Sequence, residues 1–187
     1  MSFINLVSED QAEPHLKQIY QQIRQSYGFL PNYMQALGSA PQLLEAHFAF
    51  GGEIMKDGAL SNVVKEQIAV VVSGINSSSY CVAAHMELLR QLGVEKALGR
   101  KLATDYANAP VPENVQALFR FADRLTRKPL DIEKADVETL CRAGWNDAAI
   151  LEATLAVAYF NFVSRVALSL AARRSPQKTL RRCSRST

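Results

Sequence analysis

The chain has 187 residues, of which 48% are hydrophobic and 21% are charged. This length and composition suit one globular domain with a substantial core, and they argue against a disordered or fibrous protein. The net charge of +3 comes from residues 173–187, which hold six basic residues and no acidic one, while the remainder holds 15 basic and 18 acidic residues. The charge therefore does not predict a specific nucleic-acid surface.

The opening residues lack the basic-then-apolar order of a signal peptide, and no apolar run reaches the length of a membrane span. We therefore expect a cytoplasmic protein that does not enter a membrane. The cysteines and histidines are few and widely spaced, which predicts neither a disulfide framework nor a metal site, and no cofactor is expected. These residues are Cys81, Cys141 and Cys183, and His15, His47 and His85.

Three helices are predicted in the first part of the chain, over residues 12–27, 31–37 and 42–57. The first has apolar residues at spacings of three and four, and Gly28 ends it. Pro31 and Pro41 suit the first turns of the next two. His47 lies in an aromatic run, where a packed or hydrogen-bonded core histidine is a better interpretation than a ligand.

A pair of helices is predicted around residues 62–93. Ser61 or Asn62 caps the first of them, which carries Glu66 near its start. Residues 69–72 are rich in valine and would suit a strand, but their surroundings favour a buried helix. The second helix follows a serine-rich turn and ends at Gly93.

Four further helices are predicted, over residues 94–107, 113–127, 132–143 and 148–170. The last, capped by Asn146 or Asp147, is hydrophobic nearly all round, which places it in a core or a subunit interface. Since no strand pattern occurs, the predicted fold is all-α. Residues 1–172 form the predicted domain, and residues 173–187 a basic, disordered tail.

A carboxylate, a thiol and an imidazole lie within twenty residues of one another in the predicted helix pair. Cys81 falls in the first turn of the second helix and His85 one turn later, on the same face, so the two can share a proton. Serines 77–79 can cap this helix. A helix N-terminus beside an imidazole lowers a thiol pKa, which predicts a reactive Cys81. In an antiparallel hairpin, Glu66 would reach His85.

These residues resemble a known signature. Glu66 followed by Asn76-x-Ser78-x-Tyr80-Cys81-x-x-Ala84-His85 is similar to the motif of the alkylhydroperoxidase D-like branch of the carboxymuconolactone decarboxylase superfamily. Glu66, Cys81 and His85 fall on its Glu, second Cys and His, and Ser78 replaces its first Cys. The similarity covers about residues 3–170 and is greatest to "peroxidase-related" members.

The resemblance implies a helical bundle built around a central helical hairpin, assembled as a trimer or hexamer. It also implies a thiol-dependent oxidoreductase of antioxidant defence, in which Cys81 attacks a hydroperoxide while His85 and Glu66 manage protons. In the family, a disulfide then forms and is reopened by a dithiol reductant, a partner of the peroxiredoxin or lipoyl type. Ser78 cannot form that disulfide, so oxidised Cys81 would remain a sulfenic acid until an external thiol, or a distant cysteine, resolved it. Ser78 is either natural to a one-cysteine variant or engineered to trap a state.

Two alternatives remain open on the sequence. One is a cofactor-free decarboxylase-like lyase that uses Glu66 and His85 as acid and base, with Arg165 as a candidate anchor for a carboxylated substrate. The other is an oligomeric binding protein in which Ser78 has disabled the redox cycle. Cys141 is interpreted as a core residue rather than as a resolving thiol.

Overall fold

The structure is a computed structural model, and it describes residues 2–170. The predicted basic tail and Cys183 lie outside these residues. Over the described part of the chain the elements are helical, without strands, as the sequence predicts. They are α1 (Pro14–Tyr27), α2 (Asn32–Leu37), α3 (Pro41–Met55), α4 (Asn62–Ile75), α5 (Ser79–Gln91), α6 (Lys96–Asp105), α7 (Glu113–Arg127), α8 (Lys134–Arg142) and α9 (Asp147–Leu170), with short 3₁₀ turns at Tyr106–Asn108 and Pro129–Asp131.

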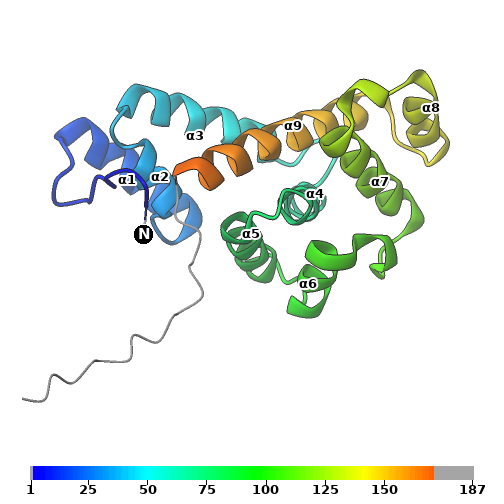
Figure 1. The fold of residues 1–187 in the computed structure, drawn as a ribbon, viewed down its shortest axis with the longest axis horizontal. Helices are drawn as coiled ribbons and strands as arrows, with labels where there is room; N and C mark the ends of the chain where they lie inside the picture. The colour runs from blue at the N-terminus through cyan, green and yellow to red at the C-terminus, as the bar shows by residue number, and fades with distance from the viewer. Residues whose placement is uncertain (1, 171–187) are drawn as a thin grey trace, which may run out of the picture.

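Helix α4 lies at the centre of the molecule and packs against α5, α6, α7 and α9 (Figure 1). Every residue from Lys65 to Ser73 is buried, which is the pattern of a helix surrounded by others. The valine-rich segment is thus a buried helix, as predicted. Its β-branched side chains cost some helix propensity, and burial of their apolar surface on all sides offsets that cost.

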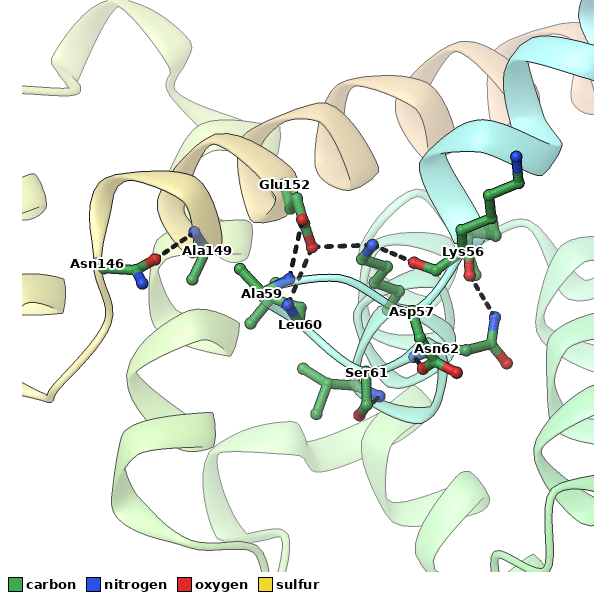
Figure 2. A network of polar contacts seen from close by, with 12 residues as sticks. Lys56, Asp57, Ala59, Leu60, Ser61, Asn62, Asn146, Ala149 and Glu152 are labelled. Carbon is green, nitrogen blue, oxygen red and sulfur yellow. Dashed lines mark hydrogen bonds and ion pairs between the residues drawn. The ribbon is translucent and has the colours of Figure 1, made fainter.

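The predicted helix ends are largely confirmed. Ser61 caps α4 by accepting a hydrogen bond from the Val64 N–H, and Asn146 caps α9 by accepting one from the Ala149 N–H (Figure 2). Gly28 ends α1 with a φ of 77°, a left-handed conformation that favours glycine. The serine-rich turn differs from the prediction. Ser78 occupies the N-cap position of α5, but its side chain makes no capping hydrogen bond.

An ion pair between the buried Lys65 and the partly exposed Glu152 ties α4 to α9. The Lys65 side chain is 2% exposed, and its Nζ lies 2.9 Å from Glu152 Oε2 and donates to the Lys56 carbonyl oxygen at 2.6 Å. The Glu152 carboxylate also accepts from the Ala59 and Leu60 N–H groups at 3.0 and 2.9 Å. Figure 2 shows Glu152 of α9 reaching over the turn that joins α3 to α4. The network holds this turn, and thereby the start of α4, against α9.

Helix α9 is long and apolar enough to cross a membrane by length and composition alone. It also packs against α3, α4 and α7, and the core helix of a globular protein meets the same criteria. Part of its surface stays exposed beside α3. Five large apolar side chains form this outer α3–α9 face: Leu43, Phe50, Leu151, Leu155 and Phe162.

Candidate functional site

Glu66 and His85 form the predicted pair. Glu66 Oε2 lies 2.7 Å from His85 Nδ1, and the carboxylate side chain is 7% exposed and the imidazole 12% exposed. The helical hairpin of α4 and α5 brings them together, as the sequence predicts. The Phe160 ring meets the imidazole edge-on, with centroids 4.6 Å apart, and fixes its orientation. Because Nδ1 is bound to the carboxylate, Nε2 is the nitrogen left for proton transfer.

Cys81 lies in the first turn of α5 and is 2% exposed. The prediction of a lowered thiol pKa is wrong for this structure: burial raises the pKa of Cys81, although the nearby hydroxyls of Ser78 and Ser164 oppose the rise. The helix N-terminus does not compensate because the sulfur is withdrawn from water, which disfavours the thiolate. Within the described residues, no hydrogen bond links the Cys81 sulfur directly to the His85 ring.

Ser78 and Ser164 lie beside the thiol on different helices. They are 1% and 0% exposed, and neither hydroxyl has a partner that satisfies hydrogen-bond geometry. Both are near enough to Cys81 to lower its thiol pKa. A buried hydroxyl without a partner is costly, so these two donors are available to a thiolate or to an oxygen added to the sulfur. The motif identified Ser78 as a site residue, but no local pattern pointed to Ser164.

Cys81, His85 and Glu66 line one cavity of about 340 Å³, together with residues of α1, α2, α3 and α9. Its walls are mainly aromatic and aliphatic, and the described residues that line it include no lysine or arginine. Aromatic rings come from five helices: Tyr27, Tyr33, Phe48, Tyr80, Tyr159 and Phe160. The cavity therefore suits an uncharged, apolar molecule.

His47 and Tyr159 form a second polar pair on the cavity wall. The Tyr159 hydroxyl lies 3.2 Å from His47 Nε2, and the two rings stack at 5.3 Å. Burial lowers the His47 pKa to about 4, so the imidazole is neutral at pH 7. A Cβ on Gly51 would lie 2.2 Å from the Tyr159 hydroxyl oxygen, so this position of α3 has to be glycine. The prediction of a packed, hydrogen-bonded His47 is confirmed.

Other residues considered on the sequence lie away from the cavity. Arg165 is exposed and donates to the backbone and side-chain oxygens of Asn161, so it does not face the site. Cys141 is exposed, and the prediction of a core position is wrong because α8 buries only Leu140. Among the described residues no cluster of histidine, cysteine, aspartate and glutamate could hold a metal ion.

The chain is similar to several known proteins. The sequence model of the carboxymuconolactone decarboxylase family matches residues 41–98, the segment that carries Glu66, Cys81 and His85. An uncharacterized peroxidase-related protein from Silicibacter sp. TM1040 is 33% identical, with a TM-score of 0.78 over 83% of this chain and 84% of that one. No protein of curated function matches.

Two further solved structures share the fold. One is an alkylhydroperoxidase AhpD core, an uncharacterized peroxidase-related protein from Ralstonia eutropha JMP134. It is 26% identical, with a TM-score of 0.85 over 94% of this chain and 93% of that one. The other is the debrominase Bmp8, solved in complex with 2,3,4-tribromopyrrole. It is 21% identical, with a TM-score of 0.79 over 94% and 95% of the two chains, and it shows the fold alone.

Proposed function

The chain belongs to the alkylhydroperoxidase D-like, carboxymuconolactone decarboxylase superfamily, and we propose that it is a thiol-dependent oxidoreductase that reduces hydroperoxides at Cys81. One observation carries the proposal: a buried thiol opens onto the same cavity as an imidazole whose far nitrogen is bound to a carboxylate. The raised pKa of Cys81 makes a base necessary, and His85, which lines the same cavity, is the base that we propose.

The proposed first step transfers one oxygen atom to sulfur. His85 Nε2 takes the Cys81 proton, directly or through one water, while the Glu66 carboxylate stabilises the imidazolium through Nδ1–H. The thiolate attacks the terminal oxygen of the hydroperoxide, so that the S–O bond forms and the O–O bond breaks. The sulfur is oxidised by two electrons, and the alkoxide leaves and takes the proton from His85. The products are an alcohol and a Cys81 sulfenic acid.

We assign the second step to an external thiol. The Ser78 hydroxyl cannot form a disulfide, and the exposed Cys141 on α8 does not line the cavity. A first thiol would condense with the sulfenic acid, releasing water and leaving a mixed disulfide, and a second would release reduced Cys81 and a disulfide of the reductant. A small dithiol, or a partner protein of the peroxiredoxin or lipoyl type, would supply both.

Three alternatives are less well supported by the site. A lyase acting on a carboxylated substrate would need a cationic anchor, and Arg165 does not line the cavity. A debrominase with the same fold suggests a second redox substrate class, because an apolar cavity of this kind also suits a neutral halogenated aromatic molecule. A binding protein without redox activity would retain the cavity but leave Cys81 inert.

The assembly is part of the same proposal. The outer α3–α9 face carries Phe50 and Phe162 at 55% and 51% exposure, in line with a homo-oligomer that covers it. Sedimentation at micromolar concentration should show a trimer or hexamer, and Phe162→Asp should dissociate it. A monomer of 20.7 kDa would contradict this proposal.

The decisive experiment titrates the reduced protein with hydroperoxide in the presence of a dimedone-type sulfenic-acid trap and identifies the labelled residue by mass spectrometry. We expect one equivalent of label at Cys81 and none in Cys81→Ser, whereas Cys141→Ser should label as the wild type does. Labelling at Cys141 only, or at no residue, would contradict the proposal.

A further inference from the structure

Tyr33 carries a hydroxyl that the fold leaves unused. The residue lines the cavity, is 4% exposed, and its hydroxyl has no hydrogen-bond partner among the described residues. Its ring is held firmly: it meets the His47 ring at 5.4 Å, and its backbone N–H donates to the Tyr80 hydroxyl at 3.1 Å. A buried polar atom without a partner costs stability, so it calls for an explanation such as a bound water, a ligand or a catalytic role.

Tyr33 lines the same cavity as Cys81, His85 and Glu66. Burial raises the Tyr33 pKa well above its usual range, and the next contributions come from Cys81, Tyr80 and Tyr27, which all line the cavity. The phenol thus remains protonated and can donate across the physiological pH range. Among the described tyrosines that line the cavity, Tyr33 is the one whose hydroxyl is both buried and without a partner, and the Ser78 and Ser164 hydroxyls are further free donors beside the sulfur.

The charge of the cavity limits what can enter it. Glu66 is the only carboxylate among the described residues that line the cavity, and these residues include no lysine or arginine to hold an anion. A carboxylated molecule would be drawn out of water beside Glu66 without a counter-charge, which is strongly unfavourable. The aromatic walls favour a bulky apolar body instead.

We propose that the hydroperoxide reduced at Cys81 is uncharged and has a bulky apolar or aromatic body, and that the Tyr33 hydroxyl donates a hydrogen bond to its leaving oxygen. This inference rests on the proposed function and names its substrate class. As the O–O bond breaks, negative charge develops on the oxygen that stays with the substrate body. A donor held in place beside that oxygen stabilises the transition state, while His85 delivers the proton that completes the alcohol.

The test compares wild type, Tyr33→Phe and Tyr20→Phe. Tyr20 is the matched control because its hydroxyl donates to the Val7 carbonyl oxygen, outside the cavity. Three quantities are measured: the rate constant of Cys81 oxidation by cumene hydroperoxide, the dissociation constant of the alcohol product 2-phenyl-2-propanol, and the midpoint of urea unfolding. The same rate constant is measured for hydrogen peroxide and for a cumene hydroperoxide that bears a carboxylate.

In Tyr33→Phe we expect the cumene hydroperoxide rate to fall by about tenfold or more and the alcohol to bind more weakly, with no loss in the urea midpoint. Tyr20→Phe should lower the midpoint and leave rate and binding unchanged. In wild type, the uncharged aromatic hydroperoxide should react at least about tenfold faster than the other two.

The inference is overturned if Tyr33→Phe changes rate and alcohol affinity by less than about twofold, or if the carboxylated hydroperoxide reacts as fast as its neutral counterpart. Binding of the alcohol product distinguishes a failure of this inference from a failure of the proposed function. If no hydroperoxide oxidises Cys81, the proposed function fails, yet Tyr33-dependent binding of the alcohol would still support the cavity assignment. If the alcohol does not bind, the cavity assignment is overturned.

Discussion

Two neighbouring residues of α4 enter two different polar pairs. Lys65 is fully enclosed and satisfied by Glu152 and the Lys56 carbonyl oxygen, and Glu152 is in turn satisfied by two backbone N–H groups. Glu66 meets His85 at the cavity, where Nε2 of the imidazole remains available. In the Lys65–Glu152 pair the charged groups are hydrogen-bonded within the fold. In the Glu66–His85 pair, Nε2 of the imidazole is still available to a reactant.

The comparison separates stability from chemistry. The Glu152 carboxyl would have a raised pKa through burial alone, but the hydrogen bonds from Leu60, Lys65 and Ala59 lower it overall, so the pair is charged and fixed. The Cys81 thiol next to the Glu66 pair has a raised pKa, and the hydroxyls around it have no partners. Such unsatisfied groups near a cavity are typical of a functional site.

The largest effect on stability is expected for Lys65→Met. It leaves the Glu152 carboxylate without its cation and removes the link between α9 and the turn before α4, at a cost of about 3 kcal/mol in the free energy of unfolding. Urea unfolding measures this cost. The double variant Lys65→Met, Glu152→Gln should recover part of it, because glutamine can still accept from Ala59 and Leu60. Equal stability of Lys65→Met and wild type would break the comparison.

Glu66→Gln should have the opposite profile. An amide can still bond to His85, so we expect a loss of about 1 kcal/mol or less in unfolding free energy. The oxidation rate of Cys81 should fall about a hundredfold, since the imidazolium loses its counter-charge. Stopped-flow oxidation and urea unfolding on the same preparation provide the two values. A large loss of stability with an unchanged rate would make Glu66 a structural residue.

His47 and Tyr159 form a third pair, which is neutral and extends the comparison. Its folded pKa of about 4 lies below the ordinary value of 6.5, so the folded state disfavours its charged form. Stability from this group is present above pH 6.5 and is lost as the pH falls towards 4, by about 2 kcal/mol at pH 5. His47→Asn cannot titrate and should show a flatter dependence of unfolding free energy on pH. A dependence equal to that of wild type would remove His47 as its source.

Sequence patterns predicted the fold well because helix signals are local. The apolar spacing of residues 12–27, the Ser61 and Asn146 caps and the Gly28 terminus all act within a few residues, and each is confirmed. The hairpin prediction placed Glu66 on His85 because one turn and one helical period determine that approach. The oligomer, the reductant and the cytoplasmic location stay predictions.

Other features depend on residues far apart in the sequence, which no local pattern reveals. Glu152 reaches Lys65 only because α9 packs against α4, and Ser164 comes close to Cys81 because α9 also packs against α5. How completely the helices cover each thiol also depends on distant residues. Cys81 is buried, which raises its pKa, whereas Cys141 on α8 stays exposed. Tyr33 likewise lines the cavity because α2 packs against α3 and also against α9, which is distant in the sequence.

The central claim is that Glu66 and His85 act on Cys81 as one unit, and a double-mutant cycle tests it most directly. The rate constant of Cys81 oxidation by cumene hydroperoxide is measured for wild type, Glu66→Gln, His85→Gln and the double variant. We expect the double variant to be no slower than His85→Gln, because Glu66 acts through the imidazole. Additive losses in the double variant, or unchanged rates in both single variants, would contradict the claim.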